Sequence, residues 1–202
     1  MTQDDIKING HAVEYRIYAE DPSRNFLPSI GFLERYAEPK PNPRVRIDTG
    51  VTEGSEISMY YDPMISKLVT HANTRKEALE LLNDVVDDYV VTGVQHNLGF
   101  CKAIISNPAF AKGEYSTKFI KEYFPEGYHG PTLSLIEEAK IAFMAAVSYY
   151  RNYLSFKTDI PEEMGAEAVY VIFDKTGDTY KIEYTFQGQY GVHLKKKGSN
   201  EW

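Results

Sequence analysis

The chain has 202 residues, of which 43% are hydrophobic and 25% charged, and its formal net charge is −7. This length fits one large domain or two small domains with a real apolar core. The acidic balance argues against nucleic acid as a partner, because the only basic run, 195–197, is interpreted as a solvated strand end. No apolar run approaches the roughly 20 residues that span a bilayer, and residues 1–5 lack the features of a signal peptide, so no membrane association is expected.

Short strands are predicted in the first third of the chain. Between His11 and Tyr18, apolar residues alternate with Glu14 and Arg16, which is the period-two pattern of a strand with one buried face. Glu14 and Arg16 then share the other face. Further extended runs are predicted at 32–37, 45–48, 57–61 and 64–70, with a proline-rich loop at 39–43 and a turn at 53–55.

Helices are predicted after these strands. Thr74 and Glu77 form a predicted capping box, apolar residues then recur at three- and four-residue spacing as far as Tyr89, and Gly93 is expected to end the helix. Two further helices are predicted, from about Asn97 to Ser106 and from near Ser116 to Pro125. Strands followed by helices indicate the α+β class, with an antiparallel sheet covered by packed helices.

The organisation into domains follows from composition. Residues 126–131 are rich in glycine and proline and are predicted to be a linker. The linker divides a domain over residues 1–125 from a second domain over residues 132–202.

The second domain begins with a long predicted helix, capped by Ser134 and Glu137. From Ala139 to Tyr150 this helix is apolar on nearly every side, so other elements have to surround it. A meander is predicted after it, with strands at 169–173, 180–186 and 190–195 and turns at 174–178 and near 187–188. Three strands cannot enclose a helix about 30 Å long, so we expect this domain to be truncated.

A candidate binding site lies on two runs that are predicted to be extended, residues 44–50 and 60–68. Arg46 on the first run carries a planar fork of donors that stays charged at any working pH, which suits an oxyanion that forms during a reaction. Beside an aromatic and acidic shelf formed by residues 60–62, it would grip a small planar oxygen-bearing ligand. An ordinary solvated strand arginine fits the same residues, so both interpretations stay open here.

Other kinds of chemistry have little support in the sequence. The chain has no glycine-rich phosphate loop, and its five histidines are scattered, so no metal site is predicted. Glu20 and Asp21 point apart on a strand end and are interpreted as loop or cap residues. The single cysteine, Cys101, excludes an internal disulfide and is interpreted as a small core residue.

Several runs resemble the C-terminal part of the biotin carboxylase domain of biotin-dependent acyl-CoA carboxylases. They appear in the family's order over roughly the first 125 residues: 10–22, 25–29, 45–46 and 60–68. Residues 116–120 and 123–127 are most similar to the biotin-bearing alpha subunits of propionyl-CoA carboxylases. Tyr15 departs from the pattern, because many relatives have cysteine there.

The resemblance implies a ligase that carboxylates biotin with ATP and bicarbonate and serves the conversion of propionyl-CoA to methylmalonyl-CoA. It implies that residues 132–202 begin a subunit-bridging (BT-like) domain, in which β-barrel-like antiparallel strands surround a central helix. The family's residues for ATP, for Mg²⁺ or Mn²⁺ and for bicarbonate activation lie upstream of the part resembled here. The chain is therefore not expected to be active alone.

Arg46 occupies the position of the family arginine that contacts biotin and bicarbonate and stabilises negative charge on the ureido oxygen. The resemblance thus makes it the catalytic and substrate-binding candidate. Tyr60, Tyr61 and Asp62 are expected to shape the wall behind it. Thr117 aligns near the adenine end of the nucleotide, although a helix cap is an equal alternative. Arg16 and Glu14 are candidates for a subunit contact.

The implied partners are the carboxyltransferase beta subunit and the biotin carboxyl carrier segment, in a hetero-oligomer. The implied location is the mitochondrial matrix for a eukaryotic chain and the cytoplasm for a bacterial one. Two alternatives remain. One is a non-catalytic subunit-interaction module, and the other is the equivalent piece of a methylcrotonyl-CoA or acetyl-CoA carboxylase.

Overall fold

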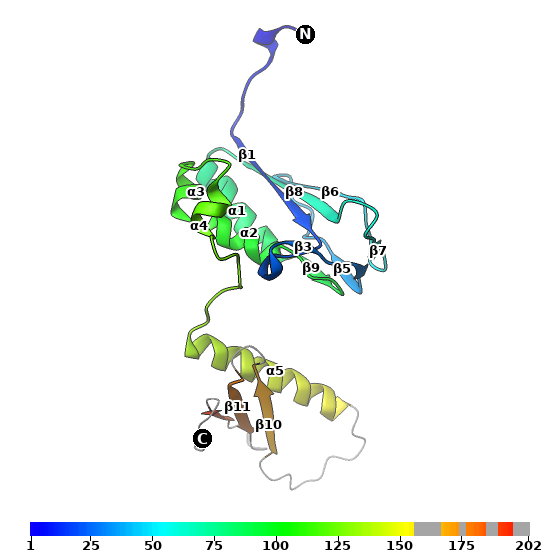
Figure 1. Cartoon of the computed structure of the whole chain (residues 1–202), viewed down its shortest axis with the longest axis vertical. Helices are drawn as coiled ribbons and strands as arrows, with labels where there is room; N and C mark the ends of the chain where they lie inside the picture. The colour runs from blue at the N-terminus through cyan, green and yellow to red at the C-terminus, as the bar shows by residue number, and fades with distance from the viewer. Residues whose placement is uncertain (156–166, 174–176, 185–189, 196–202) are drawn as a thin grey trace. The chain divides into compact units, whose positions relative to one another are not determined.

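The computed structural model describes residues 1–155, 167–173, 177–184 and 190–195. The chain divides into two compact units, unit 1 (Met1–Pro131) and unit 2 (Thr132–Trp202). Both combine antiparallel strands with helices (Figure 1), so the predicted α+β class is confirmed.

The centre of unit 1 is a three-stranded antiparallel sheet in the order β1-β8-β6, formed by β1 (His11–Tyr18), β8 (Met64–Ala72) and β6 (Val45–Thr49). Helix α1 (Arg75–Asp87) packs on one face of β1 and β8. The core between them includes Leu68 and Leu82, which are completely buried. Thr70 donates a hydrogen bond from Oγ1 to the carbonyl oxygen of Ala78 at 2.8 Å, which attaches the first turn of the helix to the sheet.

Three short strand pairs extend unit 1. They are β2 (Glu20–Asp21) with β3 (Leu27–Pro28), β4 (Gly31–Phe32) with β7 (Glu56–Ile57), and β5 (Arg35–Ala37) with β9 (Val90–Thr92). The extended run predicted at 32–37 is therefore divided between two strands. The extended run predicted at 57–61 is mostly wrong. The strand ends at Ile57, and the chain then forms a turn at 59–60 and a bend at Tyr61.

The predicted capping box of α1 is confirmed, since the Thr74 side chain accepts from the backbone of Glu77 and the Glu77 side chain accepts from the backbone of Thr74. The predicted stop at Gly93 is wrong. The helix ends at Asp87, and the chain then forms β9, which pairs with β5. Gly93 follows β9 with a φ of 96°, a left-handed conformation that favours glycine.

Three more helices follow in unit 1: α2 (Leu98–Ile105), α3 (Pro108–Lys112) and α4 (Phe119–Tyr123). Helix α2 lies close to its predicted position, α4 is shorter than predicted, and α3 was not predicted. Short 3-10 turns, η1 (Gln3–Asp5) and η2 (Pro22–Arg24), occur near the start of the chain.

Arg75, the first residue of α1, links α1 to α3. Its Nη2 donates to the carbonyl oxygen of Phe110 at 2.6 Å and its Nε donates to that of Ala111 at 3.3 Å, so it satisfies carbonyls in the last turn of α3. The guanidinium also lies 5.0 Å from the ring centre of Phe110 and 5.5 Å from that of Tyr115. These contacts combine hydrogen bonds with cation–π attraction.

Asn97 supplies the missing hydrogen bonds at the end of β1. Its Oδ1 accepts from the backbone N–H of Tyr18 at 3.0 Å, and its Nδ2 donates to the carbonyl oxygen of Arg16 at 3.1 Å. The Tyr15 hydroxyl donates to the backbone carbonyl oxygen of Asn97 at 2.8 Å. Asn97 is buried, so its amide serves as a short substitute for a neighbouring strand.

Unit 2 consists of α5 (Leu135–Ser155) and a sheet of β10 (Glu167–Ile172), β11 (Thr179–Tyr184) and β12 (Tyr190–Lys195), in that order. The Ser134–Glu137 capping box is confirmed, with the Glu137 N–H donating to Ser134 Oγ at 3.3 Å and the Ser134 N–H donating to a Glu137 carboxylate oxygen at 2.8 Å. Most of the predicted turn at 174–178, the predicted turn near 187–188 and most of the basic run 195–197 lie outside the described residues.

One side of α5 packs on its sheet, where Ala142, Ala146, Tyr180 and Ile182 form a small buried cluster. The Tyr180 hydroxyl donates to Glu138 at 2.9 Å, and burial together with this carboxylate raises the pKa of Tyr180 to about 12. Within the described part of the chain, no helix combines the length and the apolar character that a membrane crossing requires.

We predict that Gly93→Ala destabilises unit 1 more than Gly54→Ala does. Both glycines have positive φ, which costs an alanine about 1–2 kcal/mol. A Cβ at Gly93 would lie 2.8 Å from the backbone nitrogen of Glu34 and closer still to the carbonyl oxygen of Phe32, whereas a Cβ at Gly54 meets nothing within 4 Å. The clash adds about 1–3 kcal/mol. Urea unfolding followed by circular dichroism measures the difference, and equal midpoints for the two variants would contradict it.

We also predict that Asn97→Ala lowers the free energy of unfolding of unit 1 by about 1–3 kcal/mol, because two backbone groups of β1 lose their partner. The matched control is Asn73→Ala. Asn73 is exposed and its side chain has no hydrogen bond to the described residues, so its loss should stay within about 0.5 kcal/mol. The same urea experiment compares the variants, and an equal effect of both would refute the role given to Asn97.

Candidate functional site

Arg46 lies in the middle of the edge strand β6 and faces away from the core. Its neighbours Val45 and Ile47 pack against the apolar cluster of unit 1, so the alternation of the strand turns Arg46 to the opposite face. Its side chain is 75% exposed. Its Nε donates to Asp48 Oδ1 at 2.9 Å, and this bond and charge raise the pKa of Arg46. The guanidinium therefore remains cationic.

The ion pair does not close Arg46 to a ligand. Only Nε is engaged, and neither terminal amino group has a hydrogen-bond partner among the described residues. Their donors point out of the sheet face that α1 leaves open. A fork of this kind can bind two oxygens of a carboxylate-like anion, or one oxygen on which negative charge develops.

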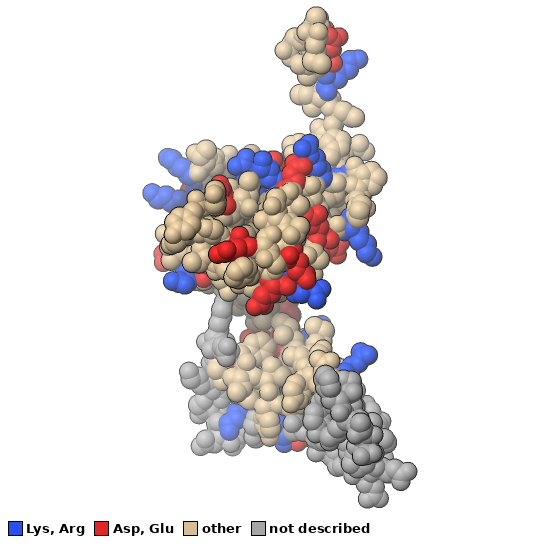
Figure 2. All heavy atoms as spheres, turned by 90° about the vertical axis from the view of Figure 1, so that its right-hand side faces the viewer, with Lys and Arg blue, Asp and Glu red and all other residues tan. Residues whose placement is uncertain are grey.

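The open face of the sheet carries charges of both signs. Glu14 and Arg16 on β1 form a second ion pair at 2.9 Å. The strand register aligns Arg16 and Lys67 with Asp48, and aligns Glu14 with Arg46 across Val69. Figure 2 shows acidic and basic side chains close to one another on the face of unit 1 that it presents. Arg46 thus lies among charges of both signs, with Asp48 beside it on β6 and Glu14 in the same row on β1.

The structure does not bring the predicted aromatic shelf next to Arg46 through the sheet. Arg46 pairs with Val69 on β8. At roughly 3.4 Å per residue, Val69 lies about 17 Å along the strand from Met64, the first residue of β8. Tyr60 lies in a turn and Tyr61 in a bend, and they are 84% and 82% exposed. The prediction of an extended shelf is wrong, because the Asp62 side chain accepts from the backbone of Met64 at 2.9 Å and so stabilises a turn.

The two acidic residues Glu20 and Asp21 have different environments. Asp21 caps η2 by accepting from the backbone of Ser23 at 2.9 Å, which confirms its predicted cap role. Glu20 is partly buried. Burial, together with the nearby charge of Asp62, raises the pKa of Glu20. The two neighbouring carboxylates are therefore shifted in opposite directions, since the hydrogen bonds from Ser23 lower the pKa of Asp21.

A group of hydroxyls behind β6 could not be found from the sequence. The Tyr36 hydroxyl lies 3.1 Å from both Thr49 Oγ1 and Glu38 Oε1, and Ser66 Oγ lies 3.3 Å from the Tyr89 hydroxyl. Burial raises the pKa of Tyr89. Because Thr49 is the last residue of β6, these bonds hold the end of the strand that carries Arg46.

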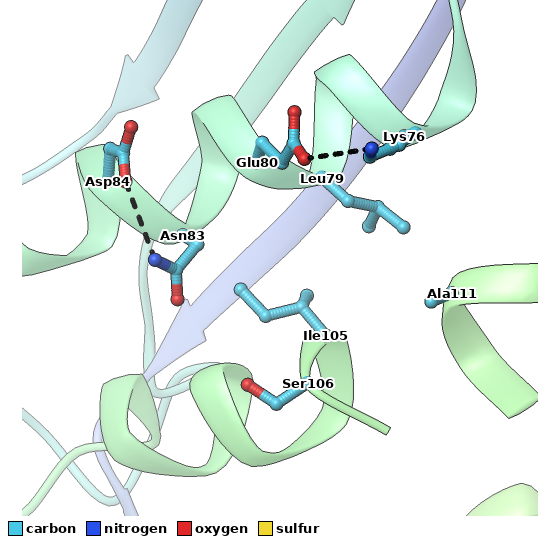
Figure 3. Close-up of a pocket in the computed structure, with 8 residues that line it drawn as sticks. All are labelled: Lys76, Leu79, Glu80, Asn83, Asp84, Ile105, Ser106 and Ala111. Atoms are coloured by element: carbon cyan, nitrogen blue, oxygen red, sulfur yellow. Dashed lines mark hydrogen bonds and ion pairs between the residues drawn. The ribbon is translucent and has the colours of Figure 1, made fainter. Parts of the chain in front are cut away.

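Among the hollows of unit 1, one of about 350 Å³ and another of about 360 Å³ lie away from Arg46, which lines neither of them. The first lies between α1, α2 and α3 (Figure 3), where Leu79, Ile105 and Ala111 form apolar walls. Its Glu80 already pairs with Lys76 at 3.7 Å. The second contains Glu20 and is bordered by these residues: Tyr15, Arg16, Tyr18, Phe26, Asn97, Phe100, Ile104 and Ile120.

The remaining candidates have simpler surroundings. Thr117 is exposed and is not a helix cap, because the N-cap of α4 is Lys118, whose N–H donates to Ser116 Oγ at 3.1 Å. Its place near a nucleotide stays a prediction. Cys101 is fully buried in the apolar cluster of unit 1, which confirms the predicted core position, and burial raises the pKa of its thiol. No set of three or more ligating side chains for a metal occurs in the described part of the chain.

The chain is similar in sequence to propionyl-CoA carboxylase alpha chains. The mitochondrial propionyl-CoA carboxylase alpha chain of Mus musculus is 48% identical over 153 residues, which are 75% of this chain and 21% of that protein. The alpha chain of Ruegeria pomeroyi is 44% identical over 168 residues, covering 74% of this chain and 25% of that protein. The chain spans about a fifth to a quarter of the length of these relatives.

Among solved structures, the biotin carboxylase domain dimer of Hydrogenobacter thermophilus 2-oxoglutarate carboxylase, in complex with MgADP, ADP and bicarbonate, is similar, with a TM-score of 0.59. The two sequences are 33% identical, and the matched region covers 61% of this chain and 27% of the Hydrogenobacter thermophilus chain. Residues 14–122 match the family described as the biotin carboxylase C-terminal domain. Since this match covers more than half of the 202 residues, the chain belongs to the family of biotin carboxylase C-terminal domains.

Proposed function

We propose that this chain is part of the biotin carboxylase subunit of a propionyl-CoA carboxylase. In that subunit it supports the ATP- and bicarbonate-dependent carboxylation of biotin that serves the conversion of propionyl-CoA to methylmalonyl-CoA. The identity of 48% to the Mus musculus alpha chain supports the propionyl type, and a methylcrotonoyl-CoA carboxylase subunit of Dictyostelium discoideum matches a shorter stretch of 120 residues. The observation that carries the proposal is the outward-facing cationic fork of Arg46.

Arg46 fits an anionic or polarised oxygen. Its two terminal amino groups are available on an open face, and the bond to Asp48 leaves the guanidinium cationic. Biotin supplies a ureido group whose nitrogen takes up the carboxyl group and whose oxygen gains negative charge. Donation from Arg46 to that oxygen, or to bicarbonate, stabilises the charge where it develops. The strand fixes the backbone of Arg46 before the reaction begins.

The chain is proposed to work with other parts of the enzyme. ATP and its Mg²⁺ or Mn²⁺ are assigned to the upstream portion of the subunit, and the carboxyl carrier segment brings biotin. The family relative from Hydrogenobacter thermophilus binds MgADP and bicarbonate as a dimer, which supports this assignment. A mitochondrial matrix location follows for a eukaryotic chain and a cytoplasmic one for a bacterial chain, since relatives of both kinds occur.

A second role, contact with the carboxyltransferase beta subunit, is proposed for unit 2. The sides of α5 that do not pack on the sheet expose apolar residues: Ile136 (69%), Met144 (62%) and Tyr149 (62%), and on β10 Ile172 is 63% exposed. Apolar side chains this exposed on both the helix and the sheet favour further covering elements or a partner. The subunit-bridging domain proposed for residues 132–202 would provide such a contact.

Arg46→Ala is predicted to reduce biotin carboxylation about a hundred- to a thousandfold, because one preorganised donor to a developing oxyanion is lost. The test uses a hybrid alpha chain, defined as the Ruegeria pomeroyi alpha chain in which residues 10–131 of this chain replace the matching segment. Bicarbonate-dependent ATP cleavage in the presence of free biotin is measured. The unsubstituted hybrid should be active, and an inactive but folded hybrid counts against the proposed function.

The matched control is Arg35→Ala. Arg35 is also a strand arginine, it is 69% exposed and it pairs with Glu53 at 3.2 Å. Its loss should leave the rate within about twofold of the unsubstituted hybrid, since exposed ion pairs contribute little. Unchanged activity of Arg46→Ala, or an equal loss in both variants, would refute the assignment of Arg46.

For unit 2, Met144→Lys is predicted to weaken binding of a propionyl-CoA carboxylase beta subunit, because it places a charge in the exposed apolar surface. The full chain is mixed with the beta subunit, and binding is measured by calorimetry. The control is Lys76→Met on α1 of unit 1, where the side chain is 84% exposed. This substitution changes the net charge by the same amount as Met144→Lys, but in the opposite sense. Retained binding by Met144→Lys would contradict the proposed contact.

A further inference from the structure

The hollow between α1, α2 and α3, which we call the helix groove, has an apolar floor (Figure 3). Leu79 on α1 and Ile105 at the end of α2 are buried, and Ala111 on α3 also lines the hollow. Its volume of about 350 Å³ is at the small end of the range for binding pockets. The helix groove therefore has room for a few side chains of a partner and not for a large ligand.

The α1 side of the helix groove carries a row of charges. Lys76, Glu80 and Asp84 recur at four-residue spacing and so lie on one face of α1. Lys76 Nζ lies 3.7 Å from a Glu80 carboxylate oxygen, and the two side chains are 84% and 63% exposed, so this pair is weak. Among the described residues, Asp84 accepts from Asn83 Nδ2 at 3.4 Å and has no cationic partner. The row therefore leaves negative charge available at Asp84.

The end of α2 adds to this negative charge. Ser106, the C-cap of α2, lines the helix groove. The last carbonyl groups of a helix carry partial negative charge, which favours a cation. Lys102 on α2 and Arg75 on α1 do not supply this cation, because Lys102 donates to Asp87 at 2.7 Å and Arg75 donates to carbonyl oxygens of α3. The Asp84 end of the helix groove is therefore complementary to a positive charge.

The walls of the helix groove determine what kind of segment fits. The backbone groups of α1, α2 and α3 are largely satisfied within the helices, so an extended segment would find few partners for its own N–H and C=O groups. A helical segment needs no such partners. Leu79 and Asp84 are five positions apart on α1, or about 7.5 Å along its axis, and two side chains one turn apart on a partner helix span about 6 Å. An apolar residue and a basic residue four positions away on one helix face match this spacing.

We propose that the helix groove docks a helical segment of a second protein, which carries an aliphatic side chain and, four positions away, a lysine or arginine. The aliphatic side chain packs on Leu79 and Ile105, and the cation meets Asp84 and Glu80. A small apolar floor with a charged rim suits a reversible contact, because permanent interfaces are more hydrophobic. None of these residues lies on the sheet that carries Arg46, so the proposal does not rest on the function proposed above.

The first test measures binding of a defined probe to the full chain. The probe is a fluorescein-labelled, alanine-rich helical peptide of about 16 residues, with leucine and lysine four positions apart on one face, and fluorescence anisotropy reports its binding. We expect a Kd on the order of 0.1 mM at low salt. A control peptide with glutamate in place of lysine should bind at least about tenfold more weakly, because it meets the carboxylates of the helix groove with like charge. Equal binding of the two peptides overturns the proposal.

The second test locates the binding site on the chain. Glu80→Gln combined with Asp84→Asn should weaken binding of the lysine peptide at least about fivefold, since two ion pairs at the edge of an apolar contact are lost. The matched control combines Glu56→Gln with Glu122→Gln, two exposed residues outside the helix groove, and changes the net charge by the same amount. It should leave the Kd within about twofold. An equal loss in both double variants shows attraction to the net charge alone and overturns the proposal.

Ser106→Phe tests the shape of the helix groove without changing its charge. Ser106 is exposed, so a phenylalanine there occupies the space that the leucine of the peptide needs. We expect binding to weaken at least about fivefold, because the apolar contact is lost. Circular dichroism checks that the variant is folded. Undiminished binding by the folded variant contradicts the proposal, and if the variant does not fold, the charge variants decide the matter.

The hybrid alpha chain decides whether the docked helix comes from a second protein. If it does, the helix groove stays open in the longer subunit, and the lysine peptide should bind the hybrid with a Kd within about threefold of that for the full chain. A folded hybrid that does not bind the peptide shows that another part of the same subunit covers the helix groove, which overturns the proposal. Peptide binding needs no carboxylation activity, so a failure of this proposal and a failure of the proposed function are distinguishable.

Discussion

The antiparallel register between β6 and β8 determines what this domain can present to a ligand. Val45 and Ile47 are paired with Thr70 and Leu68, and these residues face the core under α1. Arg46 and Asp48 alternate with them and face solvent. A shift of one residue would bury both charges and expose the apolar pair, which is strongly unfavourable. The same apolar contacts that stabilise the sheet therefore decide that a guanidinium and a carboxylate stand side by side on its open face.

The strand is also fixed at its end. Thr49 joins the hydroxyls around Tyr36, and β8 is attached to α1 through Thr70. An arginine on such a strand has a well-defined starting point for its side chain, whereas an arginine on a loop would add backbone motion to side-chain motion. The remaining conformational freedom of the guanidinium comes from the rotatable bonds of the arginine side chain. The Asp48 carboxylate accepts from Nε of Arg46, and the two terminal amino groups have no hydrogen-bond partner among the described residues.

Local signals in the sequence predicted much of this fold. Thr74 with Glu77, and Ser134 with Glu137, gave correct helix starts because a capping box depends only on neighbouring residues. Strand β9 was missed because Val90 and Val91 continue the apolar pattern of α1, and its strand character comes from pairing with β5 more than fifty positions earlier. Helix α3 was missed although Asn107, Pro108 and Gly113 are a cap, a first-turn proline and a left-handed end. The family resemblance made Arg46 a candidate, which stays a prediction, whereas the Asp48 contact and the hydroxyls behind β6 depend on geometry that no sequence pattern encodes.

The contacts of the Arg75 guanidinium affect the local unfolding of unit 1. Helix α3 has five residues, too few to persist in water unaided, and its last carbonyls are satisfied by the first residue of another helix. Fraying of the first turn of α1 therefore releases α3 at the same moment. Amide protons of α3 should share the opening free energy of the α1 start instead of exchanging as an independent surface segment. Through its stacking on Tyr115, Arg75 extends this cooperative unit toward the exposed segment that contains Thr117.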